Sequence, residues 1–434
     1  VDAAIVELRR RIDGPVSVDT GGYQVSTSIS VPFQRSMNEA VRRYLGKVRP
    51  RIKTANSVND APDACVHNGV LRPGCPVWAR VLSEDEERGG YLADLFGRLG
   101  WIPRDSLEVV EPYRPGGGVL KPGEWVKVIP LGEVLLASPR VTEEVLLQPL
   151  VEPQIAAVLL HAPTGAVLAV YGGVDHRYHP FNRAISAHRQ VGSTIKPFLY
   201  LAAAEILGWE ADTEVPIGSI DLPGAGGRKW RVRDTHRLKG TPTLTDALAH
   251  SSNTAAVRTL RKLQLAPFLE KWRQWGLPEI EGDNLSLALG NVEMSPMELA
   301  QCYSLLANYG ACAPTPTLIW HIVDGMGNPV GEAPRFCLGE ASRTAVDAVL
   351  PGLHAVVEEG TGRHASIPGL VVAGKTGTTT DGTDAWFAGI VSEHVLVVWV
   401  GSDDHEPIPG NSGPTTAAVL WKEIAMETFG APQE

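Results

Sequence analysis

The sequence contains no run of apolar residues long enough to cross a lipid bilayer, and it is poor in cysteine and in basic residues. Its five cysteines form no Cys-x-x-Cys pair, which excludes a zinc ribbon or a thioredoxin-like redox motif. The 39 lysines and arginines are outnumbered by 49 aspartates and glutamates, giving a formal net charge of −10. Such a chain repels a phosphate backbone, so no nucleic-acid partner is expected.

With 434 residues, the chain is longer than one ordinary hydrophobic core requires, so we expect two domains or one large domain with an insertion. Apolar residues make up 44% and charged residues 20%, as in soluble globular proteins. The spacing of four neighbouring histidines matches no zinc pattern, so neither a metal nor a cofactor is predicted; these are His161, His176, His179 and His188.

The most informative motif is Ser193-Thr194-Ile195-Lys196, the only Ser-x-x-Lys in the chain. A serine three positions before a lysine at a helix start places the hydroxyl and the amine on one face. The amine can then accept the hydroxyl proton, which activates a serine without a histidine. We therefore predict that Ser193 is a nucleophile and that Lys196 is its general base, with a pKa lowered by burial and by the cation Lys375.

Two further motifs follow in the order that such a site requires. Ser251-Ser252-Asn253 offers a proton relay at Ser251 and an amide at Asn253 that could hold both Lys196 and a substrate amide. Lys375-Thr376-Gly377-Thr378 offers a cation and hydroxyls for a substrate carboxylate, and we expect Gly377 to leave the strand open to substrate. The backbone N–H groups of Ser193 and Thr378 are predicted to form an oxyanion hole.

The hydrophobic pattern indicates two kinds of structure. Tyr23–Ser30 alternates like a strand, and Phe33, Met37, Val41 and Leu45 recur every four residues, as on an amphipathic helix. Short apolar runs separated by turns then predict a small β-barrel, with strands at Val77–Leu82, Tyr91–Phe96, Trp101–Ile102, Leu107–Val110 and Trp125–Ile129.

Two hairpins are predicted on either side of a helical middle segment. Ile155–Leu160 and Ala166–Tyr171 flank the turn Pro163-Thr164-Gly165, and Ala385–Ile390 and Val395–Val400 form the second pair. An antiparallel sheet that joins the two hairpins would place the Lys-Thr-Gly strand beside the helix of Ser193.

These motifs resemble the transpeptidase module of a class A (bifunctional) penicillin-binding protein. The resemblance extends to Phe181-Asn182-Arg183-Ala184, Arg189-Gln190-Val191-Gly192-Ser193, Ser295-Pro296-Met297-Glu298-Leu299-Ala300, Gly360-Thr361-Gly362-Arg363 and Asp384-Ala385-Trp386-Phe387-Ala388-Gly389. Val191 departs from the family's usual proline, which should change only the stiffness of the loop. The glycosyltransferase domain and the membrane anchor of that class have no counterpart here, so we expect a C-terminal portion of a longer protein.

The resemblance implies an α+β fold of the penicillin-binding and serine β-lactamase type, with an antiparallel sheet flanked by helices and a small OB-like β-barrel insertion. The expected division is a linker region and start of the module at residues 1–60, the OB-like domain at 61–145 and the transpeptidase domain at 146–434. The implied location is the periplasmic side of the bacterial envelope, where the missing N-terminal anchor would make the only membrane contact. For Cys65 and Cys75, a disulfide bridge and two reduced thiols are both retained as alternatives.

The implied reaction is D,D-transpeptidation through a serine acyl-enzyme. Its partners would be peptidoglycan stem peptides ending in D-Ala-D-Ala and, as covalent inhibitors, β-lactam antibiotics; other cell-wall synthesis proteins are candidate partners. A D,D-carboxypeptidase would use the same residues with water as the acceptor, and a non-catalytic penicillin-recognising sensor or scaffold is a second alternative. A serine β-lactamase is disfavoured because no Glu-x-x-x-Asn segment lies between Asn253 and Lys375.

Overall fold

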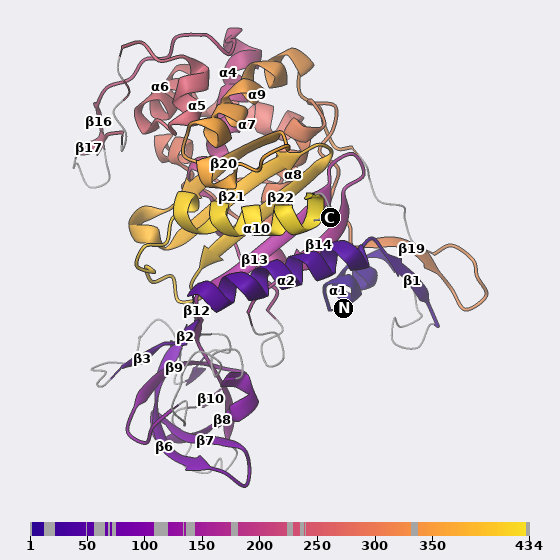
Figure 1. Cartoon of the computed structure of the whole chain (residues 1–434), viewed down its shortest axis with the longest axis vertical. Helices are drawn as coiled ribbons and strands as arrows, with labels where there is room; N and C mark the ends of the chain where they lie inside the picture. The colour runs from indigo at the N-terminus through magenta and orange to yellow at the C-terminus, as the bar shows by residue number, and fades with distance from the viewer. Residues whose placement is uncertain are drawn as a thin grey trace.

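Figure 1 shows the computed structural model, in which a small barrel lies at one end of the molecule and a larger sheet-and-helix domain at the other. The structure describes residues 2–12, 22–48, 50–55, 66–67, 70–71, 75–107, 120–132, 134–135, 144–174, 181–223, 229–234, 238, 240–330 and 337–430.

A five-stranded antiparallel sheet forms the centre of the larger domain, in the order β14-β13-β22-β21-β20. Both predicted hairpins are confirmed. The first consists of β13 (Gln154–His161) and β14 (Ala166–Tyr171), and the second of β21 (Asp384–Val391) and β22 (His394–Gly401). β13 pairs with β22 along its whole length, so the hairpins join as expected, and β20 (Val372–Thr378) is left at one edge.

Alternate residues of each strand face two different cores. Val158 and Val397 pack with the helical region that contains α4 (Lys196–Leu207) and α8 (Pro296–Ala307), whereas Leu159 and Val398 pack on the opposite face. That opposite face is covered by α2 (Val31–Val48) and α10 (Ala418–Phe429), as Figure 1 shows. The sheet is thus apolar on both faces, as a sheet between two helical layers requires.

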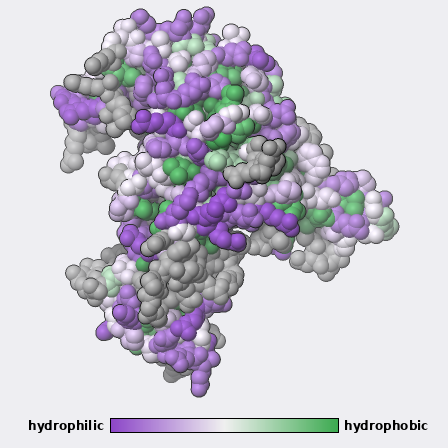
Figure 2. Space-filling view, in the orientation of Figure 1, coloured by the Kyte–Doolittle hydropathy of each residue, from purple (hydrophilic) through white to green (hydrophobic). Residues whose placement is uncertain are grey.

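The predicted amphipathic helix is confirmed as α2. Met37, Val41 and Leu45 are buried in its inner face, and Phe33 packs against the same core. The outer face of α2 is hydrophilic, as the band of polar surface in Figure 2 illustrates. Further helices among the described residues are α1 (Asp2–Arg11), α5 (Leu244–Ala249), α6 (Asn253–Leu263), α7 (Leu265–Gln274) and α9 (Arg343–Glu358).

The strand predicted at Tyr23–Ser30 is shorter in the structure. β1 spans Gln24–Thr27 and pairs with β19 (Ile319–Val323) in a ribbon beside α1. Beyond β1, the Ser28 N–H still donates to the Leu318 oxygen at 3.0 Å, and the Ser28 hydroxyl lies within hydrogen-bond distance of the backbone oxygens of Val167 and Thr317, at 2.8 and 2.7 Å.

The small domain is a closed barrel, which confirms the predicted insertion. β6 (Val77–Asp85), β7 (Gly90–Leu95), β8 (Arg98–Pro103), β9 (Trp125–Pro130) and β11 (Val145–Pro149) form the barrel. β11 closes it by pairing with both β8 and β9. The strand predicted at Leu107–Val110 is wrong at its first residue, because Leu107 ends a 3-10 turn (Arg104–Leu107) and residues 108–110 are not described. The domain boundaries after residues 60 and 145 remain predictions.

A buried charge network joins the barrel to the larger domain. Lys127 on β9 donates to Asp404 at 2.6 Å and to Glu406 at 2.7 Å, and Lys53 donates to Asp404 at 2.8 Å. Burial opposes ionisation of Asp404, but the two lysines outweigh it and hold the pKa of this carboxyl well below its usual range. The loop of residues 402–406 that follows β22 is therefore bound to the barrel.

Lys127→Ala should lower the free energy of unfolding by about 3 kcal/mol, because it leaves buried carboxylates short of a counter-charge. The effect should shrink as the pH falls through the low pKa of Asp404 in the folded state, because the protonated carboxyl no longer needs the cation. Urea denaturation at several pH values would measure it. Lys47→Ala, which breaks an exposed pair with Glu423, should cost less than about 1 kcal/mol. Equal losses in the two variants would contradict a stabilising network.

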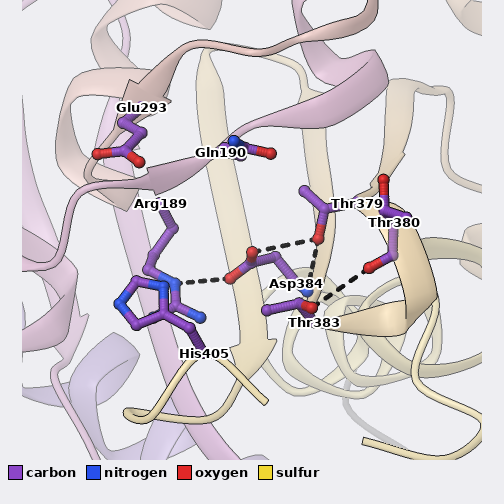
Figure 3. A pocket seen from close by; sticks show the side chains of 8 residues that line it. All are labelled: Arg189, Gln190, Glu293, Thr379, Thr380, Thr383, Asp384 and His405. Atoms are coloured by element: carbon purple, nitrogen blue, oxygen red, sulfur yellow. Dashed lines mark hydrogen bonds and ion pairs between the residues drawn. The ribbon is translucent and has the colours of Figure 1, made fainter. Parts of the chain in front are cut away.

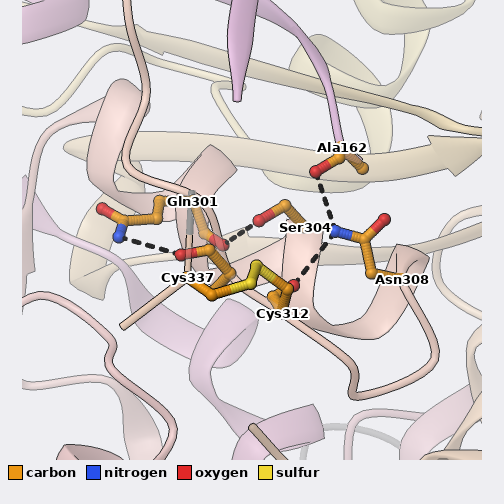
Figure 4. Close-up of a disulfide and its surroundings, with 7 residues drawn as sticks. Ala162, Gln301, Ser304, Asn308, Cys312 and Cys337 are labelled. Carbon is orange, nitrogen blue, oxygen red and sulfur yellow. Dashed lines mark hydrogen bonds between the residues drawn. A yellow bond between two sulfur atoms is a disulfide. The ribbon is translucent and has the colours of Figure 1, made fainter. Parts of the chain in front are cut away.

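A disulfide that the sequence analysis did not predict joins Cys312 to Cys337 (Figure 4). Asn308, at the end of α8, donates to the backbone oxygens of Cys312 at 3.0 Å and Ala162 at 2.7 Å, so the bridged segment is attached to the sheet. Cys75 is also disulfide-bonded, while its predicted partner Cys65 lies outside the described residues. Cys302 is buried and free. Within the described ranges, no helix has both the length and the apolar character of a membrane span.

A thiol count under denaturing, non-reducing conditions should find one reactive thiol per chain, from Cys302. The other cysteines would be consumed by the Cys312–Cys337 bridge and by the bond of Cys75 to its predicted partner Cys65. Three thiols would mean that one of the two bridges is missing, which peptide mapping would identify, and five would contradict both bridges. A reduced sample provides the five-thiol reference.

Candidate active site

Ser193 lies on a 3-10 turn, η4 (Gly192–Ile195), which continues directly into α4. Pro197 occupies the first turn of α4, where a missing N–H costs no intrahelical bond. Gly192 has a φ of +54°, a conformation that glycine adopts without strain. The predicted helix therefore begins at Lys196, one turn after Ser193. Ser193 is partly exposed and lies on the turn that leads into the helix.

Buried groups fix the turn that carries Ser193. The Thr194 hydroxyl donates to the Val191 oxygen at 2.8 Å, and the Tyr303 hydroxyl of α8 donates to the Thr194 oxygen at 2.9 Å. Val191, which replaces the family's proline, donates its N–H to the Val292 oxygen at 2.9 Å. Because proline has no N–H, this departure adds a hydrogen bond to the loop.

The Lys-Thr-Gly strand β20 packs directly against that turn. A Cβ on Gly377 would lie 2.5 Å from the Val191 oxygen, and one on Gly192 would lie 3.2 Å from the Thr378 nitrogen. The missing side chain of Gly377 admits the backbone of the nucleophile turn, which lets Gly192 lie against Thr378. That Gly377 also leaves the strand open to substrate stays a prediction.

Lys196 is fully buried and faces the second motif. Its Nζ lies 2.7 Å from the Ser251 carbonyl oxygen, 2.7 Å from Asn253 Oδ1 and 3.2 Å from Ser251 Oγ. Burial lowers the pKa of Lys196 to about 7, against an opposing effect of Asp234. A neutral amine has two N–H groups, which can donate hydrogen bonds to these two carbonyl oxygens. Its lone pair then remains available for a proton.

Lys375 approaches the same serine from β20. Its Nζ donates to Ser251 Oγ at 2.9 Å and to the Thr376 oxygen at 3.1 Å. Burial and the nearby Lys196 lower the pKa of Lys375 well below its ordinary value. Ser251 Oγ thus lies between two buried lysines from different elements, and the structure brings together Lys196, Ser251, Asn253 and Lys375, as the sequence predicts.

The hydroxyls predicted to bind substrate have partners of their own. Thr376 Oγ1 shares a 2.7 Å hydrogen bond with Thr361 Oγ1, and Thr378 Oγ1 accepts from the Gly413 N–H at 3.0 Å. Thr378 is exposed, whereas Thr376 is buried. Thr361 belongs to the Gly360-Thr361-Gly362 pattern, but no feature of the sequence indicated its contact with Thr376.

Asp234 is a second residue that sequence reasoning missed. It follows β17 (Lys229–Val232), and its carboxylate accepts hydrogen bonds from the N–H groups of Asn253 and Thr254, at 2.6 and 2.9 Å. The Ser252 side chain caps the start of α6. A lone aspartate after a short strand gives no sequence signal of this contact.

A polar pocket of about 180 Å³ opens where the chain enters the nucleophile turn and leaves β20 (Figure 3). Its wall is formed by residues before the turn, residues after β20, and two further side chains: Arg189, Gln190, Thr379, Thr380, Thr383, Asp384, Glu293 and His405. Arg189 Nε donates to Asp384 Oδ1 at 2.7 Å, and the Thr379 hydroxyl donates to Asp384 Oδ2 at 3.1 Å. No group of side chains suited to a metal occurs among the described residues, while His176 and His179 lie outside them.

A serine at a helix entrance, a buried lysine one turn later and a second serine between two lysines together define a serine acyltransferase site. Residues 155–425 match the family model of the penicillin binding protein transpeptidase domain. The chain therefore belongs to the penicillin-binding protein transpeptidase family.

Known relatives support this assignment. The chain is 30% identical over 428 residues to penicillin-binding protein 1A of Neisseria flavescens, which covers 93% of this chain and 52% of that protein. Penicillin-binding protein 1A of Haemophilus influenzae has a similar fold, with a TM-score of 0.67, 22% identity and coverage of 100% of this chain and 71% of that one. PonA1 of Mycobacterium tuberculosis, solved in complex with penicillin V, has a TM-score of 0.63, 19% identity and coverage of 98% and 89%.

The relatives named penicillin-binding protein 1A confirm the predicted resemblance to class A proteins. The chain spans about half the length of the Neisseria flavescens protein.

Proposed function

We propose that this chain is a D,D-transpeptidase that cross-links peptidoglycan stem peptides through an acyl-enzyme on Ser193. The observation that carries the proposal is the position of Ser251 Oγ, at 3.2 Å from Lys196 Nζ and 2.9 Å from Lys375 Nζ. This arrangement supplies a base for the serine and a route for a proton to the leaving group. A merely penicillin-recognising sensor would not need both.

Acylation begins with transfer of the Ser193 hydroxyl proton to the lone pair of Lys196, as Ser193 Oγ forms a bond to the donor carbonyl carbon. The carbonyl oxygen becomes an oxyanion, which the N–H groups of Ser193 and Thr378 stabilise. The carbon–nitrogen bond then breaks, and the leaving amine takes a proton from Ser251, which Lys196 replaces. Lys196 is neutral again when the ester has formed.

In the second half of the reaction, an amine from a neighbouring stem attacks the ester carbonyl. A new amide bond forms, the bond to Ser193 Oγ breaks, and the proton lost by the amine returns to that oxygen through Lys196. Water in place of the amine would make the chain a D,D-carboxypeptidase with the same residues. We favour the transpeptidase because the relatives are penicillin-binding protein 1A and the matching family model is named for transpeptidation.

The substrate is proposed to end in D-Ala-D-Ala, with its terminal carboxylate bound by Lys375, Thr376 and Thr378. A bound carboxylate would favour the protonated form of Lys375 despite its burial. β-Lactams present a similar carboxylate and a reactive amide, so they should acylate Ser193. PonA1, of similar fold, has been solved with penicillin V.

The proposed location is the periplasmic side of the bacterial envelope, with membrane anchoring and contacts to other cell-wall synthesis proteins in the full-length protein. The Cys312–Cys337 disulfide supports this location, because disulfides persist in oxidising compartments.

Mass spectrometry would test the proposal with two substrates, on the intact protein for the drug adduct and on the released products for the choice of acceptor. After incubation with benzylpenicillin, we expect the mass of one drug molecule to be added to each chain. With a D-Ala-D-Ala thioester analogue and a D-amino acid, we expect the amine-coupled product to exceed the hydrolysed one. Predominant hydrolysis would favour the carboxypeptidase, and the absence of any adduct would favour the non-catalytic alternative.

A further inference from the structure

Asp234 connects the hairpin of β16 (Ile220–Pro223) and β17 to the start of α6. Its Oδ1 accepts from the N–H of Asn253 at 2.6 Å, the N–H of Thr254 at 2.9 Å and the hydroxyl of Ser252 at 3.0 Å. Its Oδ2 accepts from the Thr254 hydroxyl at 2.5 Å. One carboxylate therefore binds three consecutive residues that follow Ser251.

These contacts satisfy groups that a helix start leaves without partners. The first N–H groups of a helix have no intrahelical acceptor, and a negative charge is favourable there. The Ser252 side chain already accepts from the Ala255 N–H, at 3.1 Å, as the helix cap. Asp234 adds a second anchor from a different segment of the chain, so the start of α6 cannot turn without breaking contacts with the hairpin.

Ser251 needs such an anchor because its backbone is strained. Its φ of +54° is uncommon for a residue with a side chain, and such a conformation persists only when the surrounding structure holds it. The end of α5 holds one side, because Ser251 N donates to the Leu248 oxygen at 3.1 Å and Ser252 N to the Ala247 oxygen at 2.9 Å. Asp234 holds the other side, and in this conformation both oxygens of Ser251 face Lys196.

We propose that Asp234 is a positioning residue of the acyl-transfer site, which holds the Ser251–Asn253 turn so that its oxygens meet Lys196. This inference rests on the proposed function. Asp234 is not a catalytic residue, because its contacts are to the turn and none of the hydrogen bonds described above joins it to Lys196. It is expected to act on the geometry of the turn and, through its charge, on the proton affinity of Lys196.

The charge effect has a definite sign. Two titratable groups act on Lys196: Lys375 from β20 and Asp234 from the segment after β17. The negative charge of Asp234 opposes the effect of burial and keeps the pKa of Lys196 higher than burial alone would leave it. Because the base acts when neutral, removal of this charge should let acylation proceed at lower pH.

Two substitutions separate geometry from charge. Asp234→Asn keeps an oxygen for the N–H groups of Asn253 and Thr254, and its amide can donate to the Thr254 hydroxyl, so the turn should persist without the charge. Asp234→Ala removes both the hydrogen bonds that hold the turn and the charge. The matched control is Asp221→Asn, which removes the same charge from the adjacent strand, where Asp221 forms an exposed pair with Arg231.

The rate of acylation by benzylpenicillin, followed by intact mass between pH 5 and 9, would test the proposal. We expect Asp234→Ala to lower the plateau rate about 10- to 100-fold, because the reacting groups lose their alignment. Asp234→Asn should keep a plateau close to wild type while the acid limb of its profile moves to lower pH. Asp221→Asn should match the wild type in both respects.

The inference would be overturned if both Asp234 variants kept the wild-type plateau rate and the acid limb of Asp234→Asn did not move. It would also be overturned if the acid limb of Asp221→Asn moved as far as that of Asp234→Asn. If Asp234→Ala unfolds, as thermal denaturation would show, the acid limb of Asp234→Asn still decides. A wild-type chain that forms no adduct would overturn the proposed function, and the inference with it, whereas an active wild type with unaffected Asp234 variants would overturn the inference alone.

Discussion

Ser193→Ala should abolish covalent labelling by penicillin while leaving the fold intact. The substitution removes the oxygen that forms the acyl bond, and it takes one hydroxyl from a partly exposed turn without opening a cavity in the core. We expect no added drug mass after an incubation that labels the wild type completely. The free energy of unfolding, measured by urea denaturation, should change by less than about 0.5 kcal/mol.

Ser36→Ala is a suitable control for this variant. Ser36 belongs to Ser36-Met37-Asn38, an earlier copy of the Ser-x-Asn pattern on α2, so the same hydroxyl is lost outside the cluster. This variant should label at the wild-type rate. Labelling of Ser193→Ala at that rate would show that another residue carries the drug and would remove the basis of the proposed mechanism.

Lys196→Ala should slow acylation by about 10²–10⁴-fold, the usual contribution of a general base. The serine hydroxyl would lose the only amine on its own turn, and the Ser251 and Asn253 oxygens would lose a buried donor, which adds about 1–3 kcal/mol of destabilisation. Single-turnover acylation with benzylpenicillin measures the rate, and circular dichroism shows whether the variant is folded at the assay temperature.

Lys127→Ala separates these two effects, because it also truncates a buried lysine but lies in the barrel network. We expect it to be destabilised and to keep the wild-type acylation rate. If Lys196→Ala instead retained most of the acylation, the role of base would pass to Lys375, whose Nζ is also within reach of Ser251 Oγ.

The sequence was sufficient to predict most of the sheet and the grouping of the site. Continuous apolar runs around turns identified both hairpins, because most of their residues are buried, and a period-4 pattern identified α2, whose inner face is buried. The order of the three motifs placed Lys196, Ser251, Asn253 and Lys375 in one site, since each motif carries a residue type with a distinct chemical role.

Contacts that depend on tertiary packing could not be predicted. Asp234 and Thr361 approach the site from segments with no local signal, and Gly377 faces a turn that only the folded chain brings near. The Cys312–Cys337 bridge was missed for the same reason, because residues far apart in sequence become neighbours only after folding. Leu107 was misplaced because a short apolar run fits a strand and a 3-10 turn equally well.

In the proposed mechanism a lysine with an unusually low pKa activates Ser193, and the decisive experiment is the pH dependence of wild-type acylation. Burial lowers the pKa of Lys196 to about 7, so the second-order rate constant for benzylpenicillin should rise with pH and level off above neutrality. We expect the midpoint of this rise near pH 7. A rate that continues to rise tenfold per pH unit up to pH 10 would show a lysine of ordinary pKa and would contradict the proposed role of Lys196.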